Sequence, residues 1–182
     1  GSGEPVRVAV CPLDEVGYVV GAVTAEGYLT LRRVGATPMG PLFDQFLEGQ
    51  RVTVCGRRGP VPGVGGVKST HLQRGRAAGA DDPFSLDNAF VDVGAATAVE
   101  VASLGVELLA PVARAKRPHR YGEGLLAAPF AGQRASCAAL IAAVRRLPAE
   151  GGGTVVAVFA RRRHFAHDGA GFALLEAARG AP

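Results

Sequence analysis

The sequence predicts an α/β domain that is interrupted by a small β-rich, barrel-like module. Three observations lead to this fold class. The segment Arg134–Leu147 carries apolar residues at three- and four-residue steps, which is typical of a helix. Thr154–Ala160 is a continuous apolar run, as in a strand that is buried on both faces. Short apolar runs alternate with Gly-rich turns between Gly17 and Gly94, which is typical of a small barrel.

The first half of the chain is expected to consist mainly of short strands. The β-branched, aromatic and alternating runs that predict them are Val6–Val10, Gly17–Leu31 (a hairpin turning at Ala25-Glu26-Gly27), Gln50–Cys55, Val61–Val67 and Phe90–Gly94. Thr97–Leu104 then predicts a short helix that ends at Gly105, because glycine suits the position after a helix.

The second half is expected to contain helices around one buried strand. A basic loop from Arg114 to Arg120 precedes the helix Arg134–Leu147 and the strand Thr154–Ala160, and Gly171–Arg179 predicts a last short helix. We therefore expect residues 4–35 and 119–182 to form the α/β domain, and residues 36–118 to form the inserted β-rich module.

Composition and charge narrow the function classes. A mean hydropathy of +0.19 excludes a disordered chain. Apolar stretches end well before the roughly 18 residues that a membrane helix requires, so no membrane partner is expected. The 20 Lys and Arg against 16 Asp and Glu give a net charge of +4, which is too small an excess to indicate a nucleic-acid partner.

The cysteines and the N-terminus suggest a compartment. Cys11, Cys55 and Cys137 are odd in number and widely spaced, which favours reduced structural thiols in the cytoplasm. The start, Gly1-Ser2-Gly3, has neither the charged nor the apolar region of a signal peptide, and we expect it to be left over from cloning.

Several separated segments carry a family resemblance. They are Pro12–Tyr18, Gly49–Val52, Pro62–Val64 with Lys68, His71-Leu72, Phe90–Ala95 and the helix that follows Gln133-Arg134. In this order they resemble the dinuclear metallo-aminopeptidases of the glutamyl, or tetrahedral, aminopeptidase family, which is also filed as cellulase M-like. The resemblance extends over roughly residues 6 to 175.

The resemblance implies an α/β catalytic domain with an inserted β-rich dimerisation domain, and assembly into large oligomers. It also implies removal of N-terminal residues from peptides by a water held between two metal ions, usually zinc or cobalt. Such a site needs His and carboxylate ligands and a carboxylate base. His71 would lie in the inserted domain, away from the metals, where we expect a loop hydrogen-bonding role.

The positions that the family uses for its ligands are altered here. Pro12 stands where the first His ligand would be, and Asp14, which would orient that His, remains. Gly132 and Gln133 precede Arg134 where the bridging Asp would be, and neither supplies an anion. The resemblance places further Asp and His ligands beyond Pro182, so a shortened member is expected.

Cations replace the paired glutamates that would follow the apolar strand. Arg163 and His164 stand at these positions, to within about one residue. The candidate anion-binding residues are Arg161, Arg162, Arg163, His164 and His167. A solvated basic turn is the alternative, and a metal site of His164, His167 and Asp168 is disfavoured because the arginines repel a cation.

Three other features have ordinary structural explanations. Asp14 and Glu15 are expected to point to opposite faces of a strand rather than to form an acid/base pair. Cys137 is expected to be a small core residue on a helix, without a base beside it. The basic run Lys116–Arg120 has no interleaved aromatic residues, so a solvated interdomain loop is expected.

These positions predict a catalytically inactive homologue that needs no cofactor and acts as a binding, regulatory or assembly subunit. A homodimer or larger homo-oligomer is expected, and an active paralogue is a further candidate partner. One alternative is an enzyme with rebuilt chemistry at the Arg/His anion site. The other is a metallo-aminopeptidase completed by a partner chain, although a partner could not replace Pro12 or Gly132.

Overall fold

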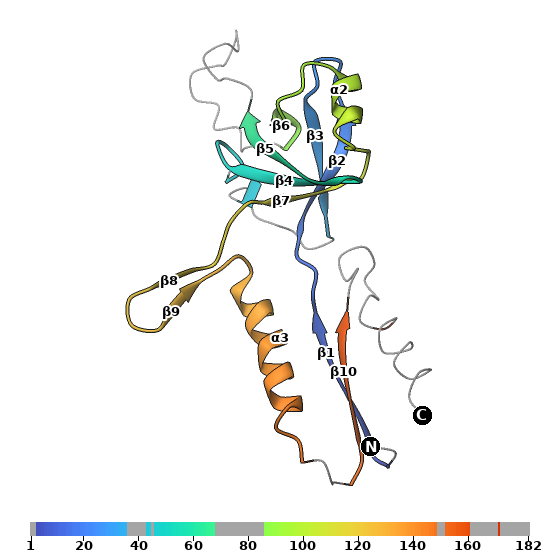
Figure 1. The fold of residues 1–182 in the computed structure, drawn as a ribbon, viewed down its shortest axis with the longest axis vertical. Coiled ribbons are helices and arrows are strands. Elements are labelled where there is room, and N and C mark those ends of the chain that lie inside the picture. The colour runs from blue at the N-terminus through green and yellow to red at the C-terminus, as the bar shows by residue number, and fades with distance from the viewer. Residues whose placement is uncertain are drawn as a thin grey trace, which may run out of the picture. The chain divides into compact units, whose positions relative to one another are not determined.

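The chain folds into two compact units, which a computed structural model describes for residues 3–35, 43–44, 46–67, 86–148, 152–160 and 171 (Figure 1). The α/β unit combines Gly1–Val16 with Arg117–Pro182, and the barrel unit is the continuous segment Gly17–Lys116. The barrel unit therefore separates the two segments of the α/β unit along the sequence.

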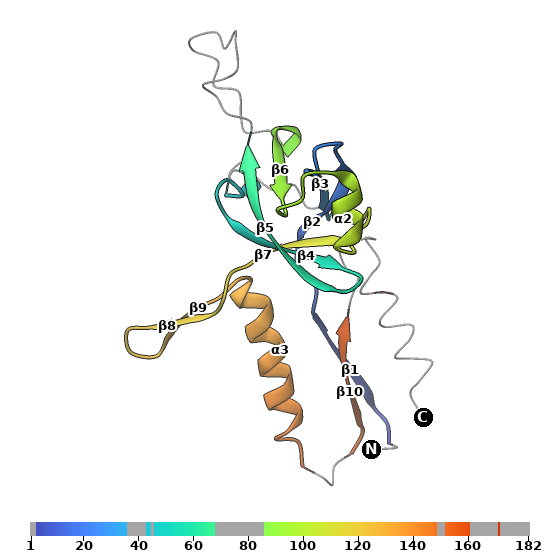
Figure 2. The same ribbon diagram turned by 45° about the horizontal axis from the view of Figure 1, so that its top comes forward.

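Six strands close the barrel in the order β2-β3-β6-β5-β4-β7 (Figure 2). Their bounds are β2 Gly17–Val23, β3 Leu29–Val34, β4 Arg51–Gly56, β5 Gly59–Val67, β6 Ala89–Asp92 and β7 Pro111–Arg114. All pairs within the barrel are antiparallel. Closure removes the free strand edges that an open sheet exposes. The β2–β3 hairpin confirms the one expected in Gly17–Leu31. Strands β4 and β5 confirm those expected at Gln50–Cys55 and Val61–Val67.

The barrel has an apolar core. Buried residues alternate with less buried ones along β3, β4 and β6, and Val20, Leu29, Val54 and Val91 have no exposed surface. A short helix, α2 (Ala98–Ser103), adds the fully buried Val101 to the same core. The core therefore draws on strands from both halves of the barrel unit.

Local capping fixes the ends of α2. The Thr97 hydroxyl accepts a hydrogen bond from the Glu100 backbone N–H at 3.2 Å, and the Glu100 carboxylate accepts one from the Ala96 N–H at 2.9 Å. Gly105 follows the helix at φ 80°, a backbone conformation that favours glycine. The helix expected at Thr97–Leu104 is confirmed.

The upstream unit boundary differs from the one expected after residue 35. The structure divides at Val16, because β2 and β3 pair with β7 and β6 inside the barrel. The hairpin that was assigned to residues 4–35 of the α/β domain therefore belongs to the barrel unit. The downstream boundary at Lys116 lies close to the expected residue 118.

The α/β unit contains a parallel pair of strands and one long helix. β1 (Val6–Pro12) pairs with β10 (Thr154–Ala160), and α3 (Ala131–Val144) contacts both strands. A separate antiparallel hairpin is formed by β8 (His119–Tyr121) and β9 (Leu125–Ala127), and all six of its strand residues are exposed. The expected basic loop is therefore partly wrong, since its end forms strand β8.

Two expectations for the α/β unit also need correction. The continuous apolar run of β10 is not buried on both faces, since Val155 is 42% and Phe159 is 36% exposed. The reason is that only two strands form this sheet in the described part of the chain. The long helix begins and ends three residues earlier than expected.

Gly171 is the one described residue of the expected last helix. In the described residues, no helix is both long and apolar enough to span a membrane.

Candidate functional site

The candidate site lies at the carboxyl ends of β1 and β10 in the α/β unit. Pro12 and Ala160, the last residues of the two strands, are register partners, and the Leu13 N–H donates to the Ala160 carbonyl at 2.8 Å. In open parallel sheets, ligands bind outside this end of the strands. Segments that are far apart in the sequence therefore meet where the family resemblance places its first metal ligand.

Pro12 is half-buried and offers no side-chain donor to a ligand. Its carbonyl oxygen accepts a hydrogen bond from the Cys137 thiol of α3 at 3.3 Å. The backbone oxygen at this position is therefore already engaged by the helix that packs on the strand. Asp14, two residues further on, is also half-buried.

Glu15 is bound by Arg134 from the first turns of α3. The Arg134 guanidinium forms an ion pair with Glu15 Oε1, and its Nε donates to the Pro129 carbonyl at 3.0 Å. The strand β1 ends at Pro12, so the expectation that Asp14 and Glu15 lie on opposite faces of a strand is wrong. They follow the strand, and the Glu15 charge is balanced by an arginine.

The N-terminal end of α3 presents neutral groups. Phe130 precedes the helix in the left-handed region, at φ 48°, and its side chain caps no backbone N–H. Gly132 is exposed, whereas Gln133 is half-buried. The Gln133 Oε1 is shielded from solvent and accepts no hydrogen bond from the described residues. This turn supplies an amide oxygen where a bridging ligand would need a negative charge.

Two thiols meet between β1 and α3. Cys11 is 7% exposed, and its thiol lies in hydrogen-bond contact with the thiol of the half-buried Cys137. Burial raises the pKa of the Cys11 thiol, and the neighbouring Cys137 raises it further. Sequence reasoning missed this pair, because nothing in the local pattern joins positions so far apart.

The remaining candidate residues lie outside the described part of the chain. They are Arg161, Arg162, Arg163, His164, His167, Asp168 and His71. The anion site therefore stays a prediction. Among the residues that the structure does describe, no group of three or more His, Cys, Asp or Glu could hold a metal ion.

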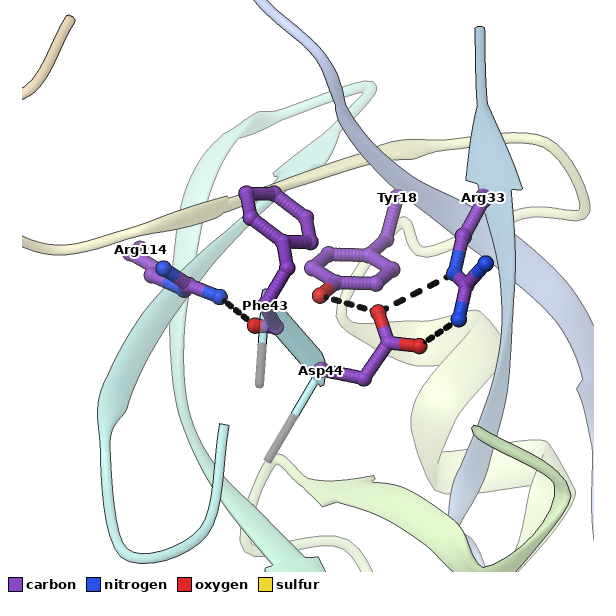
Figure 3. Close-up of polar contacts among 5 residues, drawn as sticks. All are labelled: Tyr18, Arg33, Phe43, Asp44 and Arg114. Atoms are coloured by element: carbon purple, nitrogen blue, oxygen red, sulfur yellow. Dashed lines mark hydrogen bonds and ion pairs between the residues drawn. The ribbon is translucent and has the colours of Figure 1, made fainter. Parts of the chain in front are cut away.

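A second polar cluster lies in the barrel unit and centres on Asp44 (Figure 3). Asp44 is fully buried, accepts a hydrogen bond from the Tyr18 hydroxyl at 2.9 Å and forms an ion pair with Arg33. Burial and the bond to Asp44 raise the pKa of the Tyr18 phenol. The sequence analysis did not predict that these three side chains form a cluster.

Phe43 extends this cluster toward β7. Its ring stacks on Tyr18 at 5.8 Å, and the Arg114 guanidinium lies 4.5 Å from its centroid and donates to its carbonyl oxygen. The buried carboxylate is thus fully paired with a hydroxyl and a guanidinium. We interpret the cluster as one that stabilises the fold of the barrel and is not a reactive site, because a buried charge needs such partners to be stable.

Comparisons with known proteins agree on one family. The M42 glutamyl aminopeptidase family model matches residues 1–176. Lysyl aminopeptidase of Pyrococcus furiosus is 29% identical over 147 residues, or 81% of this chain and 40% of that protein. The resemblance inferred from the separated sequence segments is confirmed.

Solved structures share the fold of the chain. Aminopeptidase APDkam598 of Desulfurococcus kamchatkensis matches with a TM-score of 0.77 at 22% identity, over 98% of this chain and 46% of that one. The TET1 peptidase of Pyrococcus horikoshii matches with a TM-score of 0.76 at 25% identity, over 94% of this chain and 49% of that one. The chain spans 29% to 40% of the length of the curated relatives it matches.

Proposed function

The chain belongs to the M42 glutamyl aminopeptidase family, and we propose that it is a member without the dimetal site, acting as a binding, regulatory or assembly subunit. The observation that carries the proposal is Pro12 at the end of β1. The family resemblance implies a His ligand there, whereas a proline side chain has no atom that binds a metal. The Pro12 carbonyl is also engaged by the Cys137 thiol.

The N-terminal turn of α3 supports the same conclusion. The resemblance implies a bridging carboxylate at Gly132 or Gln133, and a neutral amide cannot balance two divalent ions held close together. The nearby carboxylate of Glu15 is paired with Arg134. The described residues at these positions therefore do not fit a pair of zinc or cobalt ions.

A role in assembly follows from the kind of proteins that share the fold. The TET1 peptidase of Pyrococcus horikoshii can assemble into a tetrahedron or a large octahedral shell. The proposed subunit forms a homodimer or a larger homo-oligomer in the cytoplasm, and an active paralogue is the other candidate partner. Native mass spectrometry of the purified chain, alone and with such a paralogue, distinguishes these assemblies.

Metal content and peptidase activity test the loss of chemistry. The purified chain is incubated with zinc or cobalt, desalted, and assayed for bound metal by elemental mass spectrometry and for hydrolysis of aminoacyl-nitroanilides. We expect no stoichiometric metal and no turnover above the buffer rate. Lysyl aminopeptidase of Pyrococcus furiosus, carried through the same steps, serves as the positive control. Stoichiometric metal together with turnover that a chelator abolishes would overturn the proposal.

A further inference from the structure

The thiols of Cys11 and Cys137 form a pair that the proposed function does not use. Cys11 lies in β1 and Cys137 in α3, and the two side chains are in hydrogen-bond contact. The Cys137 sulfur is also 3.3 Å from the carbonyl oxygen of Pro12, the residue that follows Cys11. Both contacts bring the Cys137 sulfur up to the β1 strand at the position of Cys11. A disulfide needs this kind of close approach between its two side chains.

We propose that Cys11 and Cys137 are a modification site at which a hydroperoxide forms a disulfide that ties α3 to β1. The oxidant belongs to the class of hydrogen peroxide. This inference is independent of the loss of the dimetal site, because it rests on where the two cysteines lie: the Cys137 sulfur of α3 is 3.3 Å from the carbonyl oxygen of Pro12, the residue next to Cys11 in β1.

The two thiols have different roles in the reaction. Cys137 is half-buried whereas Cys11 is buried, so Cys137 is the more accessible of the two residues to peroxide. It attacks one peroxide oxygen, the O–O bond breaks, and the products are Cys137 sulfenic acid and water. The Cys11 sulfur then attacks the Cys137 sulfur, the S–O bond breaks, and the hydroxide leaves with the Cys11 proton as a second water.

The burial of Cys11 supports this order of events. Only 7% of Cys11 is exposed, and burial raises the pKa of its thiol, so it forms the reactive thiolate less readily than an exposed cysteine does. Direct oxidation of Cys11 by peroxide is correspondingly slow. Cys11 therefore acts as the resolving thiol for Cys137.

The packing of the α/β unit gives the bond a mechanical consequence. None of the residues of α3 is buried, and only Cys11 and Ala160 are buried among the described residues of the unit. A covalent bond at this point therefore fixes a helix that few other contacts hold. It also closes a loop that contains the barrel unit, which restricts the unfolded chain.

Cys55 provides a control within the chain. It is exposed and lies in β4 of the barrel unit. Peroxide is expected to oxidise it without an intramolecular partner. The Cys55→Ser variant removes this side reaction and any disulfide between molecules that Cys55 would form.

The test treats reduced Cys55→Ser protein with a small excess of hydrogen peroxide and digests it with trypsin after blocking free thiols. Cleavage after Arg7, Arg32, Arg134 and Arg145 places Cys11 in residues 8–32 and Cys137 in residues 135–145. We expect these two peptides to be joined in monomeric protein, with complete release by dithiothreitol. We also expect the melting temperature of the oxidised protein to rise by about 5 °C.

The matched control is Cys137→Ser in the same background, which keeps a hydroxyl that donates to the Pro12 carbonyl. It is expected to leave Cys11 unmodified and to show no change in melting temperature on peroxide treatment. The wild-type protein, mapped in the same way, yields the same joined peptides without depending on any variant. The proposal is wrong if the two peptides are recovered separately, with free or over-oxidised thiols, or joined only between molecules.

Discussion

The barrel unit and the α/β unit differ in how much of their structure is enclosed. The barrel has a closed set of strands around Leu29, Val54 and Val91, none of which has exposed surface. In the described part of the α/β unit, the sheet has two strands and the helix α3 buries no residue. Two-stranded sheets are marginally stable, and parallel ones normally have both faces covered. The barrel unit is therefore better packed than the described part of the α/β unit.

One ion pair from each unit shows the same contrast. Asp44 of the barrel is completely buried and is held by both Arg33 and the Tyr18 hydroxyl. The Arg134–Glu15 pair of the α/β unit has side chains that are 60% and 24% exposed. Solvent screens the second pair and not the carboxylate of the first. We therefore expect a single substitution to lower the stability of the barrel unit much more than a matched substitution lowers that of the α/β unit.

The largest expected effect comes from a cavity in the barrel. Leu29→Ala removes a side chain with no exposed surface and is expected to lower the opening free energy of the barrel strands by about 3 kcal/mol. Ile141→Ala on α3, where the side chain is 42% exposed, is the matched control and should cost less than about 1 kcal/mol. Amide hydrogen exchange by mass spectrometry measures each unit separately. Equal losses at the two positions would contradict the comparison.

A smaller effect is expected from the buried carboxylate. Asp44→Asn keeps the shape of the side chain but leaves Arg33 with a neutral partner, and should lower the barrel's free energy of unfolding by about 2 kcal/mol. Glu15→Gln is the matched change in the α/β unit and should cost about 0.5 kcal/mol or less. Urea denaturation followed by hydrogen exchange compares the two variants. A larger loss from Glu15→Gln would show that solvent does not screen that pair.

The elements that could be predicted from the sequence are those with local signals. Thr97 and Gly105 mark both ends of α2, and the turn at Ala25–Gly27 marks the hairpin of β2 and β3. The strand β8 was missed because all three of its residues are exposed. Such a strand needs no apolar residues at alternate positions, which is the pattern that predicts a strand from sequence. Local chemistry predicts where chain segments begin and end better than which unit they join.

The candidate site was predicted by position and not by contact. Pro12 and Gln133 were recognised because a family pattern assigns their places a ligand. The Arg134–Glu15 pair joins residues 119 positions apart, and the Cys137 thiol bonds a carbonyl 125 positions away. Asp44 was missed because a lone acidic residue is ordinarily exposed. Its burial depends on Tyr18 and Arg33, which only the folded barrel brings to it.

The smallest expected effect is a gain of stability in the barrel. Leu109 has φ 63° and is 69% exposed, so it occupies a left-handed conformation without a packing benefit. Its N–H donates to the Val20 carbonyl at 2.9 Å, and glycine would keep that bond. Leu109→Gly should therefore stabilise the barrel by about 0.5 kcal/mol, because relief of the strained conformation outweighs the added freedom of the unfolded chain. The adjacent Leu108→Gly, at an exposed position without positive φ, should instead lose about 0.5 kcal/mol. Thermal unfolding that moves both variants in the same direction would show that the conformation at Leu109 is not strained.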